Sequence, residues 1–597
     1  MNSNDISKDP VSPLVLWGHW FTFINILLAM LVASRYLVAE GWPDTPLGQV
    51  YMVTNWIGHF AFLGFITYLI ALFPVTLLLP YSRILRGYGA TIATLAQSAL
   101  LFDTQVFAHY RLHLNPFVFD LAANDLNALL KNPVLLLVPV AIMALQLLIA
   151  NGLWKRLKRF QRRRIGSKVT TVLVCCFGFS HLVHAWADAT VYRPITTQDE
   201  IFPLHYPFTA KRFMARQGLL DDESVTEREL TAAPTHQLNY PTAPLQCRPQ
   251  QRPDILMVVV DGWRADLVDN TTMPRLLAYG EKNQWFSQHY SGSNEFHYGL
   301  FTLLYSMLPS YEPSLSADLK PPVLNQQLQQ AGYRLTLYGD HELSGGRHMV
   351  ALFSGFDQKL PPESDVAAER DIATTNQVLA DMIADTDPQF RLVTYRSPAL
   401  YSTPVGYLGI PTTRPESQLN YAEQILYNQY RQSLSFLDEE LARLLAGTDE
   451  QTLVILTGSR GKVFTTDMGR GNHDNYSQPA VQVPLVIHWP GAKARRFNRP
   501  TSHYGLVPAL MSDLLNCHNP IRQYSLGESL FQPQALPYLV MGNGHSFAIR
   551  NDEGTTVIND AGEFRVFGPT YQRQRDVSLD VPTLLGMMEE GRRFRSQ

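Results

Sequence analysis

The sequence predicts a chain with two parts, a membrane domain of five transmembrane helices followed by an α/β domain whose sheet is mostly parallel. The first third of the chain holds five long apolar segments. The rest alternates short apolar runs, which suit buried strands, with helical stretches, and this alternation is typical of helices that cover a parallel sheet. We therefore expect a membrane domain over residues 1–188, a linker over 189–250 and a soluble α/β domain over 251–597.

Each of the five apolar segments approaches the ~20 residues that a helix needs to cross a bilayer. Buried helices of soluble proteins are rarely so long and so poor in charge, and the first segment lacks the basic start and small-residue cleavage site of a signal peptide. Pro74 falls inside the second segment, where a membrane helix tolerates it as a kink. The expected spans cover residues 14–38, 56–79, 88–108, 133–153 and 169–187.

Basic residues in the loops predict the orientation of these segments. Eight lysines and arginines, and no acid, lie between Lys155 and Lys168, and the turn between the second and third segments holds Arg83 and Arg86. Cytoplasmic loops carry such an excess of positive charge, and the same charge attracts anionic phospholipid. We therefore expect a cytoplasmic N-terminus, with everything after Ala189 outside the cytoplasm.

Composition sets limits on the chemistry. The formal net charge is −3, so the chain lacks the overall basic character of a nucleic-acid-binding protein. Four dispersed cysteines do not form a zinc site. Cys247 and Cys517 fall in the exported part, where they would either form a disulfide or remain two buried thiols. Polar side chains inside the spans, such as His181 and His184, are expected to hydrogen-bond between helices rather than to line a transport path.

One stretch of the linker combines basic and aromatic residues. Read as a helix from Thr209, it would place apolar side chains in the outer surface of the bilayer, and its two basic side chains would meet lipid phosphates with help from the amides at the helix start. The alternative is a short amphipathic helix that docks on the soluble domain. The residues expected to contact lipid are Phe208, Thr209, Ala210, Lys211, Arg212 and Phe213.

The second part of the chain reads as buried strands separated by helices. In such folds the functional site lies at the carboxyl ends of the strands, which directs attention to Asp261, to residues 458–460 and to the loop near His473. The expected strands cover residues 254–260, 333–338, 452–457 and 483–491, and the expected helices cover residues 273–285, 323–332 and 422–445.

Several motifs of this part resemble the sulfatase branch of the alkaline-phosphatase superfamily, over about residues 250–545. Those enzymes use a metal held by carboxylates and histidines, which activates a Thr, Ser or modified Cys nucleophile and stabilises the transferred group. The resemblance implies that Asp261 and His473 correspond to metal ligands. The motifs are Val-Val-Asp261-Gly262, Gly332-Tyr333, Gly355-Phe-Asp357, Thr452-Leu-Val-Ile and Val483-Pro-Leu-Val-Ile-His-Trp-Pro-Gly491.

The catalytic pattern of that branch is broken in this chain. The loop that carries the nucleophile corresponds to residues 291–299, where the hydroxyl position falls at Glu295 or Phe296 and the nearest hydroxyl, Ser293, is out of register. Arg460 follows a strand where two metal ligands belong, and a guanidinium repels a dication.

Asp261 and His473 alone remain of a metal site that needs about four ligands. Asp261 also has a structural reading, as a carboxylate at a strand end that pairs with Arg460. The resemblance therefore implies a pseudoenzyme without a cofactor, and the alternative is a residual divalent metal at Asp261 and His473.

A second resemblance covers nearly the whole chain and is to the YejM/PbgA family of Gram-negative inner-membrane proteins. It implies an inner-membrane protein that binds lipopolysaccharide through the segment of Phe208 to Phe213 and signals to the adaptor LapB, the protease FtsH and the deacetylase LpxC. Lys211 stands where the family usually has arginine, which removes one bidentate contact with phosphate. The motifs are Trp17-Gly-His-Trp20, Ser34-Arg-Tyr36, His113-Leu-Asn-Pro116, Trp186-Ala-Asp188, Tyr192-Arg-Pro-Ile195 and Tyr206-Pro-Phe-Thr-Ala-Lys-Arg-Phe213.

Three functions compete at this point. A non-enzymatic sensor and regulator of lipopolysaccharide fits the broken site and the basic-aromatic segment, and we favour it. A metal-dependent phosphatase or phosphoethanolamine-type transferase would need the nucleophile and the metal ligands. A cardiolipin carrier between the membranes rests on analogy of fold alone.

Overall fold

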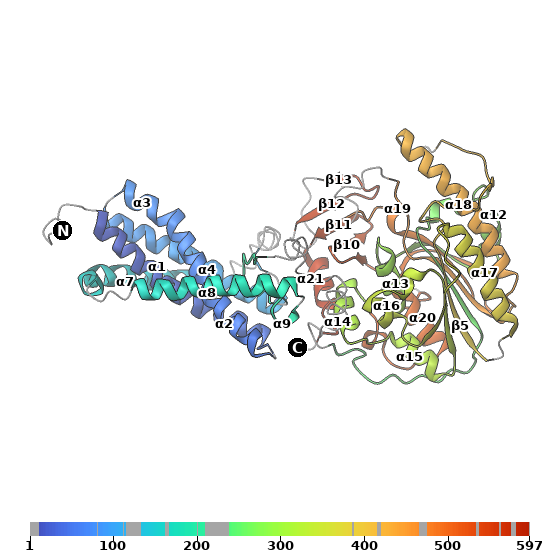
Figure 1. The fold of residues 1–597 in the computed structure, drawn as a ribbon, viewed down its shortest axis with the longest axis horizontal. Coiled ribbons are helices and arrows are strands. Elements are labelled where there is room, and N and C mark those ends of the chain that lie inside the picture. Colours follow the sequence, from blue (N-terminus) through green and yellow to red (C-terminus); the bar gives the residue numbers. More distant parts are fainter. Residues whose placement is uncertain are drawn as a thin grey trace. The chain divides into compact units, whose positions relative to one another are not determined.

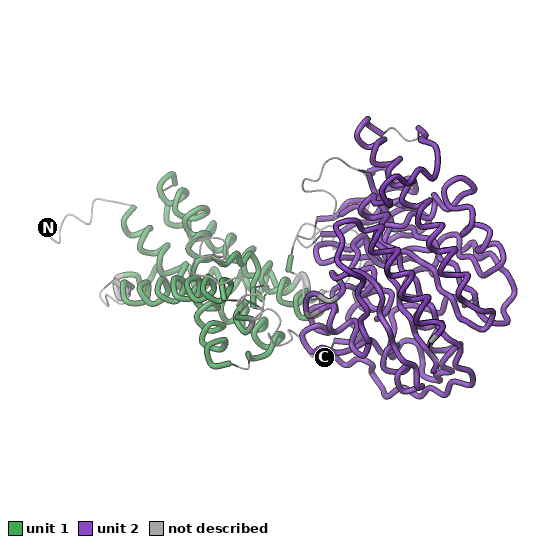
Figure 2. The backbone as a smooth tube through the Cα atoms, turned by 45° about the vertical axis from the view of Figure 1, so that its right-hand side comes forward, with its two compact units in different colours: residues 1–233 green, residues 234–597 purple. Residues whose placement is uncertain are grey.

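The computed structural model describes two compact units, Met1–Ala233 and Pro234–Gln597 (Figure 2). We describe each unit by itself. The described residues run from 11 to 595, without residues 44, 80, 111–112, 115–132, 162–165, 191, 197, 200, 209–237, 385–386, 415–418, 465–473, 533–535, 560–562 and 575–580.

Unit 1 is a bundle of long helices (Figure 1). Helix α1 packs against α2, α4 and α7, while α2 packs against α8 and α4 against α7. The helices are α1 (Val11–Glu40), α2 (Pro46–Thr67), the π-helical turn η2 (Tyr68–Leu72), α3 (Phe73–Leu78), α4 (Ser82–Tyr110), α7 (Pro133–Gln161), α8 (Gly166–Ala189) and α9 (Arg193–Thr196).

A helix occupies each of the five predicted spans. Among the described residues, four helices are long and apolar enough to cross a membrane, namely Val11–Glu40, Pro46–Leu78, Leu137–Leu157 and Gly166–Ala189. Helix α4 is as long but less apolar, because it carries side chains such as Gln97 and Asp103. That α4 also crosses the membrane stays a prediction.

Several polar side chains of α4 form hydrogen bonds inside the bundle. The amide of Gln97 donates to the backbone carbonyl of Asn25 at 3.0 Å, and Gln146 of α7 donates to the Asn25 side chain at 2.7 Å. The Tyr36 hydroxyl donates to Asp103 at 2.5 Å, and His113 lies 2.7 Å from the same carboxylate. The expectation of hydrogen bonds between helices is confirmed for these residues, and such pairing is what polar groups at membrane depth require.

The predicted kink at Pro74 takes the form of a π-helical turn. Residues Tyr68–Leu72 form this turn directly before the proline. Proline has no backbone N–H and cannot continue the regular hydrogen-bond pattern, so the wider turn re-pairs the backbone at this point.

Unit 2 is built around an eight-stranded sheet with the strand order β4-β3-β5-β1-β6-β7-β2-β8. Strand β7 is antiparallel to both its neighbours, and the other described pairings in this sheet are parallel. The predicted, mostly parallel α/β sheet is confirmed. The strands are β1 (Ile255–Val260), β2 (Gln284–Tyr290), β3 (Arg334–Tyr338), β4 (Phe356–Lys359), β5 (Gln389–Tyr395), β6 (Leu453–Gly458), β7 (Gln482–His488) and β8 (Arg495–Ser502).

The central strand β1 is apolar throughout because helices cover both faces of the sheet (Figure 1). Its odd-numbered residues pack in a core that includes α13 and α15, and its even-numbered residues pack in a second core with α12, α17 and α18. A strand buried on both faces reads as a continuous apolar run. These helices are α12 (Pro274–Glu281), α13 (Phe296–Tyr305), α15 (Val323–Gln330), α17 (Ala367–Ala384) and α18 (Tyr421–Leu445).

Two features of unit 2 differ from the prediction. The helix expected over residues 273–285 ends at Glu281, and Trp285 lies in β2, where its ring packs directly against the backbone of Gly280. The sequence analysis also missed a second, antiparallel sheet of order β13-β12-β11-β10-β9. Its strands are β9 (Leu539–Gly542), β10 (Ser546–Asn551), β11 (Gly554–Asn559), β12 (Phe564–Phe567) and β13 (Arg573–Gln574), followed by α21 (Val581–Glu590).

Short helices complete unit 2. They are η3 (Ala265–Leu267), η4 (Pro309–Tyr311), α14 (Glu312–Ala317), η5 (His341–Ser344), α16 (Gly346–Leu352), α19 (Gln478–Val481), η6 (His503–Gly505), α20 (Leu506–Ala509), the π-helical turn η7 (Leu510–Leu514) and η8 (Ile521–Gln523).

A disulfide joins Cys247 and Cys517, which are 270 residues apart in the sequence. Of the two alternatives left open by the sequence, the structure therefore shows the paired one. The disulfide joins the segment before β1 to the loop after η7. The same two residues also form an isolated β-bridge.

Candidate functional site

The predicted site at the strand ends is centred on Asp261, which directly follows β1 and is fully buried. Strands β5 and β6 flank β1 in parallel register, with Tyr395 and Gly458 both opposite Val260. The residues after these three strands therefore meet at one edge of the sheet.

Two arginines contact the Asp261 carboxylate from opposite sides. Arg460, after β6, donates from Nε to Oδ1 at 2.8 Å and from Nη2 to Oδ2 at 3.5 Å. Arg396, after β5, places its Nε 3.4 Å from Oδ2. The ion pair between Asp261 and Arg460, which the sequence suggested as a structural reading, is thus present and is joined by a second arginine.

The charges around Asp261 determine its ionisation. Burial by itself raises the pKa of the Asp261 carboxyl, but the nearby charges of Arg460, Arg396 and Lys462 outweigh this effect and hold the pKa below its usual value. Burial, followed by the charge of Arg460, lowers the pKa of Lys462 to about 8. Asp261 is therefore an ionised carboxylate whose charge three cations already balance.

Lys462 is fixed beside this ion pair. Its Nζ donates to the backbone carbonyl of Ala399 at 2.7 Å and lies 4.4 Å from the centre of the Tyr401 ring. An ammonium over an aromatic face is attracted by the ring quadrupole. The ring and the carbonyl hold the Lys462 charge at the strand edge.

The loop that would carry a nucleophile offers none at the expected position. The Ser293 hydroxyl is buried and accepts a hydrogen bond from the Glu295 backbone amide at 3.1 Å. Glu295 is the residue that precedes α13, and Phe296 begins that helix. The guanidinium of Arg396 lies 4.6 Å from the centre of the ring of Phe296, one of the two residues at the predicted hydroxyl position, and this geometry is a cation–π contact.

The described residues do not fit the metal that sulfatase-like enzymes carry. Within the part of the chain that the structure describes, no group of three or more His, Cys, Asp and Glu side chains is placed to hold a metal ion. His473, the second predicted ligand, lies outside the described residues. Asp261 is surrounded by cations, which repel a dication.

Three residues of this site, Arg396, Lys462 and Asp371, were not predicted from the sequence. The buried carboxylate of Asp371 accepts the backbone amide of Ser397 at 2.8 Å and that of Arg396 at 3.2 Å, which fixes the turn after β5. Burial raises the pKa of Asp371 to about 6. The aromatic and aliphatic residues within Gln389–Tyr395 could have indicated a strand there, and with it Arg396 at the same edge as Asp261.

Of the predicted lipid-binding residues, Phe208 is described, and Thr209, Ala210, Lys211, Arg212 and Phe213 lie outside the described residues. His184, near the end of α8, hydrogen-bonds through Nδ1 to the Phe208 carbonyl at 2.9 Å. The Phe208 amide donates to His181 at 3.4 Å, and the two rings are 4.7 Å apart. Phe208, the first residue of the predicted lipid-binding segment, is therefore hydrogen-bonded to α8, the last long helix of the bundle.

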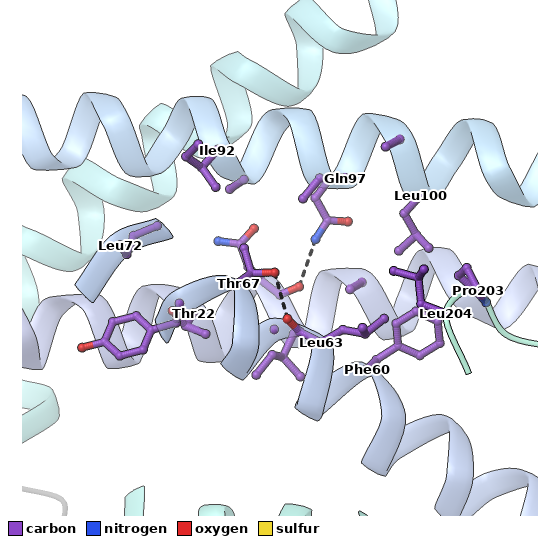
Figure 3. A pocket seen from close by; sticks show the side chains of 18 of the residues that line it. Thr22, Phe60, Leu63, Thr67, Leu72, Ile92, Gln97, Leu100, Pro203 and Leu204 are labelled. Carbon is purple, nitrogen blue, oxygen red and sulfur yellow. Dashed lines mark hydrogen bonds between the residues drawn. The ribbon is translucent and has the colours of Figure 1, made fainter. Parts of the chain in front are cut away.

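Two cavities lie between helices of the bundle. One, of about 370 Å³, is bordered by α1, α2 and α4 and reaches Pro203 and Leu204. Figure 3 shows leucines around its lining and the Gln97 amide, which is held by its hydrogen bond. The other, of about 940 Å³, is bordered by α1, α2 and α8. Both linings are mostly apolar side chains, which suits hydrocarbon chains.

Two family models match the chain. A family model described as "Domain of unknown function (DUF3413)" matches residues 4–247, and the family model "Sulfatase" matches residues 253–514. The chain is similar to the inner membrane protein YejM of Salmonella typhimurium, with 32% identity over 98% of each protein.

A protein of Haemophilus influenzae described as uncharacterized is 30% identical over 97% of this chain and 95% of its own length. Among solved structures, a protein in the alkaline phosphatase superfamily from Vibrio parahaemolyticus matches 63% of this chain and 98% of its own, with 14% identity and a TM-score of 0.47.

Proposed function

This chain belongs to the family of the inner membrane protein YejM, and on that premise we propose that it is a sensor and regulator of lipopolysaccharide. In this proposal, lipid A binds at the outer face of the inner membrane through the segment that begins at Phe208. The membrane helices then pass the signal to LapB, FtsH and LpxC, which control lipopolysaccharide synthesis in the cytoplasm.

The attachment of Phe208 to α8 is the observation that carries this proposal. His181 and His184 hold the backbone of Phe208 at the end of that helix. Lys211 and Arg212 follow Phe208 by three and four residues in the sequence. We propose that they bind the phosphates of a lipid headgroup by charge-assisted hydrogen bonds.

The cavities of the bundle support a lipid ligand. The cavity between α1, α2 and α4 extends to Leu204, four residues before Phe208 in the sequence. Its walls offer apolar surface of the kind that acyl chains bury. A lipid whose phosphates meet Lys211 and Arg212 would find hydrocarbon-lined space in the same unit.

The state of the Asp261 site supports a non-enzymatic role for unit 2. Arg460 and Arg396 contact the carboxylate that would otherwise face a metal, and the predicted hydroxyl position is held by Glu295 or Phe296. A hydrolase of this type needs both a metal and a nucleophile. We propose that unit 2 keeps the sulfatase-like fold without its catalytic chemistry.

We also propose a topology for the chain. Helix α4 would form a fifth span beside the four apolar helices, because its buried side chains Gln97 and Asp103 contact Asn25, Tyr36 and His113 inside the bundle. The basic residues of the loop after α7 would then lie in the cytoplasm, and unit 2 would lie in the periplasm.

The test is lipid A binding by the purified full-length protein, compared with the Lys211→Ala/Arg212→Ala variant. Each charge-assisted contact is worth about 1.5 kcal/mol or more, so binding should weaken by about 100-fold. Lys155→Ala/Arg156→Ala, an equal loss of charge on α7, is the matched control and should bind like the wild type. Metal content is measured on the same samples. Unchanged binding together with a stoichiometric divalent metal would reopen the hydrolase function.

A further inference from the structure

A strap of residues 201–208 follows the short helix α9 and lies on the bundle. Its first two side chains are buried in the core of the bundle. The side chains of Leu204, Tyr206 and Phe208 are 70%, 82% and 64% exposed. Burial of apolar surface therefore holds the start of the strap but contributes little to holding its second half.

Histidine rings connect the second half of the strap to the helices. His59 of α2 donates from Nε2 to the Pro203 carbonyl at 2.8 Å. His205 of the strap lies 3.1 Å from the side-chain oxygen of Asn55 in α2. An imidazole in such a contact changes its hydrogen bonds when it takes up or loses a proton. The attachment of the strap is therefore linked to the protonation of these rings.

Phe208, the last residue of the strap, is held at both of its backbone polar groups. His184 of α8 donates from Nδ1 to the Phe208 carbonyl at 2.9 Å, and the Phe208 amide donates to Nδ1 of His181 at 3.4 Å. The two histidines are three residues apart and lie on one face of α8. The two contacts need opposite protonation states, because Nδ1 of His184 must carry a proton and Nδ1 of His181 must not.

Asp199 determines the charge of His184. Its Oδ1 lies 2.7 Å from Nε2 of His184. Since both ring nitrogens of His184 face acceptors, this ring is an imidazolium. The carboxylate balances its charge, so the ion pair persists while His184 remains protonated.

His181 has a different electrostatic environment. Among the described residues, two acids act on His184, whereas the titratable group that acts on His181 is His184 itself. Burial lowers the pKa of His205, the neighbouring ring in the strap. The titratable groups that pack around the two rings are Tyr51, His59, Asp188, Asp199 and His205.

We propose that His181 and His184 form a pH-sensitive clamp, which holds Phe208 on α8 near neutral pH and releases it in mild acid. Histidine ordinarily titrates near about pH 6.5, so acid places a proton on Nδ1 of His181. That nitrogen then cannot accept the Phe208 amide, and its new charge repels the imidazolium of His184 one turn along the helix. The exposed side chains do not hold the end of the strap in place once these contacts are lost.

This clamp goes beyond the proposed function, because it concerns the attachment of the strap and not a ligand. In the proposed topology α8 ends at the outer side of the membrane, so the clamp would respond to the pH of the periplasm. Its test contains no lipid A, and the clamp and the proposed lipid A binding can therefore fail independently of each other.

The experiment is amide hydrogen exchange of the full-length protein in lipid nanodiscs at pH 7.5 and pH 5, read by mass spectrometry on peptides that cover residues 203–208. After correction for the intrinsic effect of pH on exchange, protection of the Phe208 amide should fall at least about tenfold at pH 5, since both hydrogen bonds of the clamp are lost. Circular dichroism should show the same helicity at both pH values, as expected for a local opening.

His181→Asn is the decisive variant, because it keeps an acceptor near the position of Nδ1 but cannot take up a proton. It should protect the Phe208 amide equally at both pH values. His181→Gln, with the same acceptor on a longer side chain, is the second variant and should behave alike. His19→Asn, which changes an exposed histidine of α1 in the same unit, is the matched control and should keep the pH dependence of the wild type.

Four results would overturn the clamp. The first is equal wild-type protection at both pH values, and the second is a general loss of helicity at pH 5. The third is a loss of protection at pH 5 in His181→Asn as large as in the wild type, or a loss already at pH 7.5 in both variants of His181. The fourth is an equal removal of the pH dependence by His19→Asn.

Discussion

Inside the helical bundle of unit 1, polar side chains such as Asn25, Gln97 and Gln146 are joined by hydrogen bonds between neutral groups, whereas unit 2 buries an ionised carboxylate between two arginines. In each unit, the pairing of the buried polar side chains suits the surroundings of that unit. Charge is costly in a bundle surrounded by lipid, so neutral partners are favoured there. At the sheet edge of unit 2, the charge of Asp261 is supported by the opposite charges of Arg460 and Arg396.

The units also differ in covalent links. Unit 2 has the disulfide Cys247–Cys517, while the described cysteines of unit 1, Cys175 and Cys176, are free. We expect the stability of unit 2 to depend on its charges and its covalent link, and the stability of unit 1 to depend on neutral contacts.

The largest effect is expected from Cys247→Ser/Cys517→Ser. The disulfide closes a loop of about 270 residues, and its loss should lower the free energy of unfolding of unit 2 by about 4 kcal/mol. Thermal unfolding of the full-length protein measures this. Cys175→Ser/Cys176→Ser in α8 is the control and should leave the transition of unit 2 unchanged. Equal transitions for both variants would show that the link does not stabilise the fold.

Arg460→Met should lower the free energy of unfolding of unit 2 by about 3 kcal/mol, because a buried carboxylate loses its main partner. Asp261→Asn/Arg460→Met should recover most of that loss, since the buried group that lost its main partner is then neutral. Arg334→Met, which removes the exposed pair with Asp357, should cost at most about 1 kcal/mol. A similar cost for both single variants would show that burial of the Asp261 pair has no energetic consequence.

The pH dependence of unit 2 should reveal Asp371. Burial raises the pKa of Asp371 to about 6 from its ordinary value of 3.8, so the folded state holds the proton more tightly than the unfolded state. Its contribution to stability is therefore fully present below about pH 4 and is lost as pH rises through about 6. Asp371→Asn should then be more stable than the wild type at pH 7.5, by on the order of 2 kcal/mol.

Thermal unfolding at several pH values measures that difference, which should vanish near pH 4. Asp261 has the opposite sign, because its lowered pKa adds stability above its ordinary pKa that is lost as pH falls through the folded value. A constant difference between Asp371→Asn and the wild type at all pH values would contradict the raised pKa.

The smallest effect is expected in the bundle. Asp103→Asn keeps one of the two oxygens that accept from the Tyr36 hydroxyl and the Leu114 amide, so it should cost about 1 kcal/mol. Titration of the full-length protein with sodium dodecyl sulfate, followed by loss of helicity, measures the change against Tyr36→Phe. A loss as large as that of Arg460→Met would show that charge at Asp103 holds the bundle together and would remove the contrast between the units.

The sequence by itself determined the helices and strands that have a clear pattern of apolar residues. Apolar length placed the helices of unit 1, since a bilayer fixes the length of a spanning segment. The continuous apolar run before Asp261 placed β1, because a strand buried on both faces has no polar side. The same reasoning predicted that Asp261 and Arg460 end neighbouring strands.

The tertiary structure alone decided which distant residues meet. Arg396 and Lys462 join Asp261 because they follow β5 and β6, the parallel neighbours of β1, whose carboxyl ends lie at one edge whatever their separation in sequence. Asp371 lies on α17 and joins them by accepting the backbone amides of Arg396 and Ser397. The pairing of Cys247 with Cys517 and the second sheet depend in the same way on contacts between distant segments. The periodicity of apolar residues shows which faces of a segment are buried, but it does not show which other segments it contacts. The charges that surround Asp261 were therefore decided only when the chain folded.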